Sequence, residues 1–184
     1  MIQHLTTPAR ATLLLAALAS AGPGAAETIE PSHLVQAFDE TCRLGFPNLQ
    51  TVRASAVANG WAESQLRVIA APRGRDVAPP QALRKGRFSL LMAAGPRSGM
   101  PQSCHVFAIG IQGRTRGSET IALPELAPLA AALAASLGLG EPAVASSRDA
   151  DQAQWRLAQG YILTASVQSR GPGRSASIAV RVEP

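Results

Sequence analysis

The chain has 184 residues, of which 46% are hydrophobic, 16% charged and 4% aromatic, and its formal net charge is +5. This balance excludes an intrinsically disordered chain, a collagen-like chain and a coiled coil for most of the sequence. Once an expected export signal is removed, about 158 residues remain, which is the size of one ordinary globular domain with its own core.

The first 26 residues match the three-part pattern of a secretory signal peptide. Arg10 supplies a positive charge, residues 11–19 form a short apolar run, and small residues continue to Ala26. The run is about half the ~20 residues that a helix needs to cross a bilayer, so we expect no membrane span after signal removal. The sequence therefore predicts a signal peptide over 1–26, a single domain over 27–184 and a periplasmic or secreted product.

Two helices are predicted next. In the segment Pro31–Leu44, Leu34, Phe38 and Cys42 recur at i, i+4 and i+8, and Gly45 follows the expected end. A second helix is predicted to begin after Asn48, a favourable N-cap residue, and to end at Gly60. The spacing in the first helix places Cys42 on its buried stripe, together with Leu34 and Phe38.

The hydrophobic period then changes from about 3.6 to 2, which indicates strands. We predict strands over Gln65–Ala71, Arg87–Ala94 and Ser103–Ile111, and a solvated loop between the first two. The strand Ser103–Ile111 is apolar on both faces, as expected of a central strand.

A third helix is predicted with Pro124 in its first turn and Gly138 beyond its end. An irregular stretch follows through Asp151. The chain then forms a hairpin, in which 161–168 and 176–182 alternate around a turn at 170–173. This order predicts an α+β fold: a mostly antiparallel sheet with two N-terminal helices and one later helix packed on it, and a C-terminal hairpin.

Cys42 and Cys104 are the only cysteines, and an even count in an exported chain indicates a disulfide. Closing a loop of about 60 residues would stabilise the fold by about 4 kcal/mol on the chain-entropy model. The alternatives are a reactive thiol or a metal ligand.

Several features together resemble a family of small exported proteins of Gram-negative bacteria that has no established activity. They are Phe38 and Cys42 on an N-terminal helix, Gly60-Trp61, the second cysteine in Cys104-His-Val-Phe107, and Trp155 before a C-terminal hairpin. The resemblance implies a single domain with a disulfide, and it implies no catalytic residue.

Common catalytic and cofactor motifs are absent from the sequence. It has no H-E-x-x-H, C-x-x-C, G-x-S-x-G, P-loop or G-x-G-x-x-G, so no metal and no cofactor is predicted. The imidazole of His105 could activate the thiol of Cys104. Neighbouring residues on a strand point to opposite faces, however, so these two side chains should not meet. A hydrolase that uses His105 with a serine or carboxylate brought near by folding remains an alternative.

The densest basic cluster contains Arg73, Arg75, Arg84, Lys85 and Arg87. Prolines and a glycine surround it, and no aromatic residue is interleaved for stacking on bases, so nucleic acid is an improbable partner. A solvated loop is the simplest interpretation, and an anion-binding site is the alternative.

These observations favour an exported, disulfide-linked, non-enzymatic binding or interaction domain whose partner is a protein or a small molecule. The His105 hydrolase and the anion-binding protein are retained as alternatives. Neither the partner nor the oligomeric state follows from the sequence.

Overall fold

The computed structural model describes residues 27–64, 80–95, 101–110, 121–168 and 174–183. Three predicted features lie outside these residues: the signal peptide 1–26, the strand Gln65–Ala71 and the hairpin turn 170–173.

Strands outnumber helices among the described elements. In chain order these are β1 (Glu27–Thr28), α1 (Pro31–Phe38), the π-helix η1 (Asp39–Arg43), α2 (Leu49–Ala58), β2 (Ala62–Glu63), β3 (Gln81–Lys85), β4 (Phe88–Ala93), β5 (Ser103–Gly110), β6 (Ile121–Ala122), α3 (Leu126–Leu137), β7 (Ala143–Ser146), β8 (Asp151–Leu157), β9 (Tyr161–Gln168) and β10 (Arg174–Val182).

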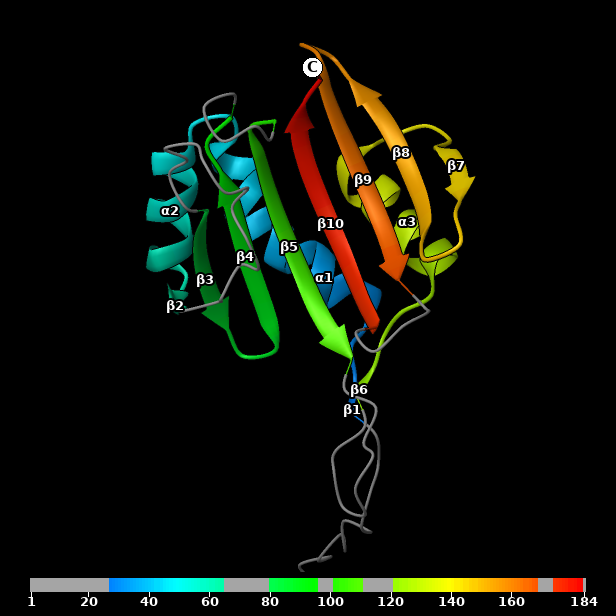
Figure 1. The fold of residues 1–184 in the computed structure, drawn as a ribbon, viewed down its shortest axis with the longest axis horizontal. Helices are drawn as coiled ribbons and strands as arrows, with labels where there is room; N and C mark the ends of the chain where they lie inside the picture. Colours follow the sequence, from blue (N-terminus) through cyan, green and yellow to red (C-terminus); the bar gives the residue numbers. More distant parts are fainter. Residues whose placement is uncertain (1–26, 65–79, 96–100, 111–120, 169–173, 184) are drawn as a thin grey trace, which may run out of the picture.

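Eight strands form one antiparallel sheet in the order β2-β3-β4-β5-β10-β9-β8-β7, as Figure 1 shows. β1 and β6 form a separate parallel pair beneath it. A mixed fold with a large antiparallel sheet is therefore confirmed, and β9 and β10 pair antiparallel where the sequence predicts a hairpin. β5 and β10 lie at the centre of the sheet.

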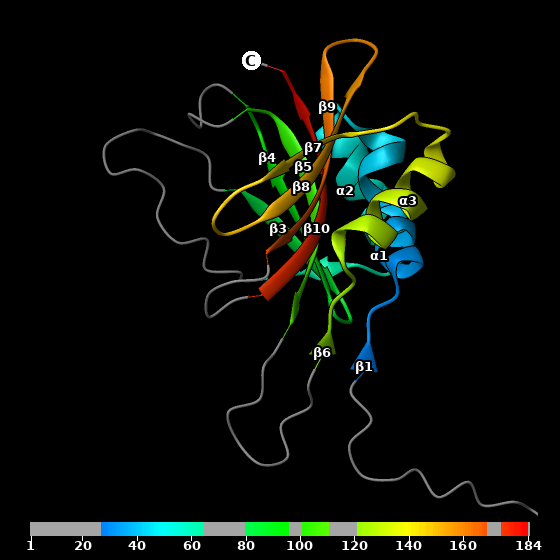
Figure 2. The same ribbon diagram turned by 90° about the vertical axis from the view of Figure 1, so that its right-hand side faces the viewer.

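The α-helices α1, α2 and α3 lie on the same side of the large sheet (Figure 2). The core fills the space between the two layers, and its largest fully buried side chains include Leu34, Val106, Leu129, Leu133 and Ile178. The alternation of β5 explains this placement, because Cys104, Val106 and Ala108 are buried toward the helices.

The first predicted helix begins at Pro31 as expected, but its second half is a π-helix. In η1, Thr41 is completely buried, and its hydroxyl donates a hydrogen bond of 2.7 Å to the carbonyl oxygen of Ala37. This bond satisfies a hydroxyl that would otherwise be buried without a partner. The period of the sequence does not distinguish such a wider turn from an ordinary α-helical turn.

The predicted start of α2 is confirmed. The Asn48 side chain accepts hydrogen bonds from the backbone N–H groups of Gln50 and Thr51, at 3.0 and 3.2 Å. Gly45 allows α2 to approach the end of η1, because a Cβ atom at this position would lie 2.4 Å from the backbone nitrogen of Val52. The glycine is therefore required by a close contact, and not only by the end of a helix.

Two predicted loops are wrong in part. Arg84 and Lys85, expected in a solvated loop, belong to strand β3, whose only fully buried side chain is Leu83. One buried side chain cannot reveal a period of 2. The stretch before Asp151, expected to be irregular, contains β7, and all four of its residues are exposed.

Candidate functional site

The two cysteines form a disulfide that connects the helical layer to the sheet. Cys42 on η1 and Cys104 on β5 are both fully buried, with Cα atoms 5.6 Å apart. The predicted bridge is confirmed, and neither cysteine is a free thiol. Thiol chemistry at Cys104 is therefore blocked while the bond is intact.

His105 lies on the opposite face of β5, away from the helices. The sheet register places Leu91 of β4 and Ala179 of β10 beside it, and its ring centroid is 5.5 Å from that of Phe107. Burial among these groups lowers the pKa of His105 below its ordinary value of 6.5. The surroundings thus favour the neutral imidazole.

The described sheet neighbours of His105 supply hydroxyl groups but no acid. Ser89 on β4 and Ser177 on β10 both pair with Phe107, so they occupy diagonal positions about 7–8 Å from His105. In the described part of the sheet, no Asp or Glu occupies a direct or diagonal position beside this histidine. The hydrolase hypothesis therefore has candidate nucleophiles here, without a carboxylate to orient the base.

The described residues of the basic cluster do not share one face, and two of them form ion pairs with acidic side chains. Arg73 and Arg75 lie outside the described residues. The Lys85 ammonium lies 2.7 Å from a carboxylate oxygen of Glu40, and the Arg87 guanidinium lies 2.5 Å from one of Glu27. Glu40 and Glu27 therefore neutralise part of the positive charge with which this cluster would attract an anion.

Arg84 points to the other face of β3, as the alternation of the strand requires. Its Nε–H donates to the carbonyl oxygen of Gly86 at 3.0 Å. Anion binding by these residues stays a prediction.

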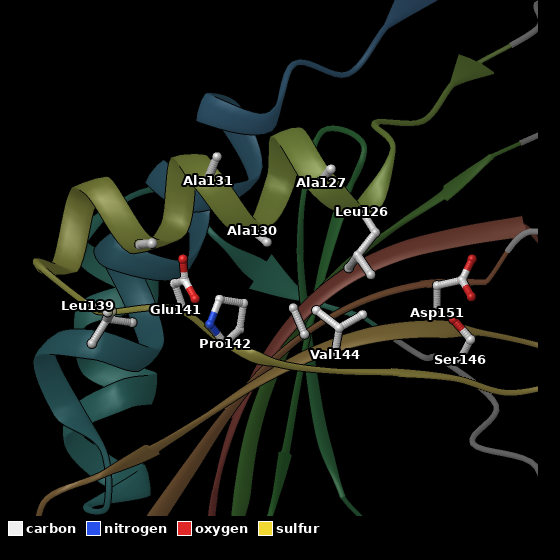
Figure 3. Close-up of a pocket in the computed structure, with 13 residues that line it drawn as sticks. Leu126, Ala127, Ala130, Ala131, Leu139, Glu141, Pro142, Val144, Ser146 and Asp151 are labelled. Atoms are coloured by element: carbon white, nitrogen blue, oxygen red, sulfur yellow. The ribbon is translucent and has the colours of Figure 1, made fainter.

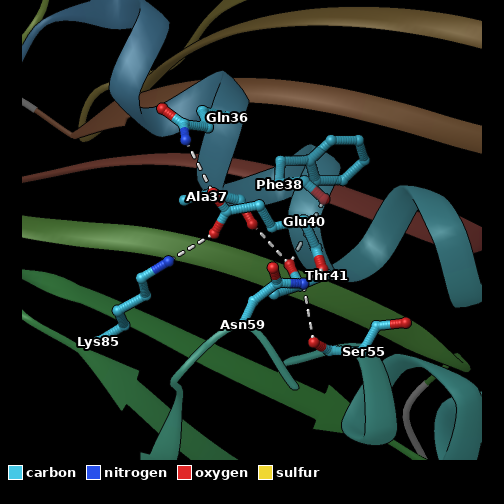
Figure 4. Close-up of polar contacts among 8 residues, drawn as sticks. All are labelled: Gln36, Ala37, Phe38, Glu40, Thr41, Ser55, Asn59 and Lys85. Atoms are coloured by element: carbon cyan, nitrogen blue, oxygen red, sulfur yellow. Dashed lines mark hydrogen bonds and ion pairs between the residues drawn. The ribbon is translucent and has the colours of Figure 1, made fainter. Parts of the chain in front are cut away.

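Glu40 is the centre of a polar network that joins α1, α2 and β3 (Figure 4). Its carboxylate accepts hydrogen bonds from Lys85 at 2.7 Å and from Gln36 at 2.8 Å. Its backbone carbonyl accepts one from the Asn59 side chain at 3.2 Å. The bond from Lys85 lowers the pKa of Glu40, and the network is best explained as a structural connection between elements.

A groove lies between α3 and strands β7 and β8, as Figure 3 shows, with a volume of about 730 Å³. We refer to it as the α3–β7 groove. Its helical wall consists of Leu126 and four alanines of α3. Its other walls come from β7, β8 and the α3–β7 connection, and include Leu139, Pro142, Val144 and Ala153. Small side chains leave this space open, whereas Leu129 and Leu133 of the same helix fill the core.

Two carboxylates line separate parts of the α3–β7 groove: Glu141 by Pro142, and Asp151 by Ser146 (Figure 3). No ion pair or hydrogen bond of either carboxylate is observed in the described part of the chain. The groove thus combines apolar walls with two carboxylates.

The hydrophobic periodicity of the sequence does not predict this groove. One signal was present: Ala127, Ala130, Ala131 and Ala134 recur at i, i+3, i+4 and i+7, which gives α3 a face of small side chains. Such a face is equally typical of a helix packed closely on a neighbour, so the sequence could not show that it is open.

The described residues contain no group of three or more His, Cys, Asp or Glu side chains that could hold a metal ion. Among these same residues, no helix is long and apolar enough to cross a membrane. No protein-family model, no curated protein and no solved structure matches this chain.

Proposed function

We propose that this domain is a non-enzymatic binding module and that the α3–β7 groove is its ligand site. The observation that carries the proposal is the groove itself, whose volume of about 730 Å³ and apolar walls are typical of sites that hold small molecules or side chains. A ligand with an apolar body would displace water from the alanine face of α3, and this release favours binding.

Two further observations support binding over catalysis. Both cysteines are held in the disulfide, and the neighbours of His105 include no carboxylate in the described sheet. We also propose that the protein is exported, since a disulfide is stable in the oxidising compartments outside the cytoplasm.

The neutral, apolar fluorescent dye Nile red tests the proposed site. We expect it to bind the folded protein, and we expect Ala131→Trp, which fills the groove from α3, to weaken binding by about tenfold or more. Ala135→Trp is the matched control, because Ala135 is an exposed alanine of the same helix that does not line the groove.

The measurements are fluorescence titrations of the three proteins, with thermal midpoints to confirm that each is folded. Equal affinity of the dye for the two tryptophan variants would show that the groove is not the site. Absence of dye binding to the wild-type protein would also contradict the proposal.

A further inference from the structure

We propose that the natural ligand of the α3–β7 groove is an extended polypeptide segment that adds to the free edge of β7. Alternate apolar side chains of the segment enter the groove, and cationic side chains meet Glu141 and Asp151. This inference rests on the proposed function, because it names the class of ligand for the same groove.

Among the described strands, β7 is the last of the large sheet, and its one partner is β8 (Figure 1). Just after β7, the Ser147 N–H donates to the Ala150 carbonyl at 2.9 Å, so these two residues form a hydrogen-bonded pair. Along an antiparallel strand, residues that bond to the partner strand alternate with residues whose N–H and C=O groups point away from it. Counting back, Ala145 and Ala143 bond toward β8, and the N–H and C=O groups of Val144 and Ser146 face the open edge. These groups are the template that an added strand requires.

The side chains of β7 align this open edge with the groove. Val144 pairs with Ala153 and Ser146 with Asp151, and all four of these residues line the groove on the side of α3. A strand added to β7 continues the pleat of the sheet, so every second side chain of that strand projects to the side of the sheet that α3 occupies, next to the groove. Backbone pairing and filling of the groove are therefore possible at the same time.

Within the described part of the chain, the four-residue strand β7 carries no lysine and no proline of its own, and Pro142 directly precedes it. Proteins commonly guard an edge with lysine, proline, a bulge or a very short strand. β7 contains only Ala-Val-Ala-Ser, and all four residues are exposed. The opposite edge, β2, has two residues, and its Glu63 is ion-paired with Arg53.

The charges at the groove indicate the chemistry of the segment. The chain as a whole is positive at +5, yet the groove carries the carboxylates of Glu141 and Asp151 in separate places. From 141 to 146 an extended chain spans about 17 Å, so a segment of about seven residues reaches both carboxylates. We therefore expect cationic side chains near both ends of the segment and apolar side chains between them.

A second copy of this chain is a less suitable occupant. Its own β7 would direct only Val144 and Ser146 toward the groove, and these side chains are too small to fill about 730 Å³. It would also bring a second set of Glu141 and Asp151 close to the first, and like charges repel at short distance.

The probe for this inference is the peptide acetyl-Lys-Thr-Leu-Thr-Leu-Thr-Lys-amide, which places both leucines and both lysines on one face of a strand. We expect it to bind the wild-type protein and to shift the backbone amide resonances of β7 and β8 in an NMR titration. Val144→Pro should weaken peptide binding by about tenfold or more, because it removes an edge donor while sparing the bonds to β8. Val144→Thr keeps the N–H and a similar size but adds a hydroxyl to the groove wall. It is the matched control for the lost donor, and it should bind the peptide more tightly than Val144→Pro does.

A second pair of measurements tests the charges. The double variant Glu141→Gln/Asp151→Asn should bind the lysine peptide at least several-fold more weakly at low salt. The same peptide with glutamate in place of both lysines should not bind the wild-type protein detectably. Thermal midpoints confirm that each variant is folded.

Three outcomes would overturn the inference. If Nile red binds but the lysine peptide does not, the groove is a ligand site and its ligand is not an extended peptide. If Val144→Pro binds the peptide as well as Val144→Thr does, the edge of β7 takes no part. If the wild-type protein sediments as a dimer that Val144→Pro dissociates, a second copy occupies the edge.

Discussion

The imidazole of His105 is held between strands β4 and β10, and burial lowers its pKa below 6.5. As the pH falls through 6.5, the unfolded chain binds a proton at this histidine that the native protein does not bind. The free energy of unfolding should therefore decrease on acidification, and the decrease should stop once the pH is below the pKa of the native state. Urea titrations between pH 7.5 and 5 measure this slope.

His105→Gln should remove that part of the slope, whereas His33→Gln, which alters an exposed histidine of α1, is the matched control. Identical pH slopes for His105→Gln and the wild-type protein would contradict the argument. A histidine that acted as a catalytic base would make the same substitution abolish an activity, so this variant also bears on the hydrolase hypothesis.

At the scale of elements, sequence patterns predicted those with a strong local signal and missed those without one. β9 and β10 alternate over eight or more residues, and α3 has a leucine stripe, so both patterns exceed chance. β7 is exposed on both faces. Because neither face is buried, its sequence need not alternate between apolar and polar residues. β8 is the exception, because Ala153, Trp155 and Leu157 alternate on one face and a strand was predictable there.

The N-cap of α2 provides a prediction at this scale. Asn48→Ala removes the acceptor for two backbone N–H groups and should reduce the free energy of unfolding by about 1 kcal/mol. Asn48→Asp keeps an oxygen acceptor and should lose much less. Chemical denaturation of the three proteins measures the difference, and an equal loss for both variants would mean that the side-chain bonds do not stabilise α2.

At the scale of the whole molecule, the groove depends on neighbours that are far apart in sequence. β5 and β10 pair at the centre of the sheet although about 70 residues separate them, and this pairing places β7 at one edge. Local periodicity contains no information about strand order. The sequence could therefore predict a disulfide, three helical segments and a large antiparallel sheet, but not the open edge beside α3.

The disulfide tests whether the two layers depend on each other. The double variant Cys42→Ala/Cys104→Ala should reduce the free energy of unfolding by about 4 kcal/mol on the chain-entropy model. Reduction of the wild-type protein should lower its thermal midpoint by a similar amount, which separates the lost bond from the altered side chains. An unchanged midpoint in the variant would contradict a stabilising role.

Nile red binding should nevertheless persist in this variant below its thermal midpoint. β5 carries Cys104 and is separated from β8 by two strands, so the walls of the α3–β7 groove do not include the disulfide. Loss of both stability and dye binding at a temperature where the variant is still folded would show that the disulfide positions the groove. Loss of stability alone would show that its effect is on the unfolded chain, which it constrains, and not on the geometry of the site.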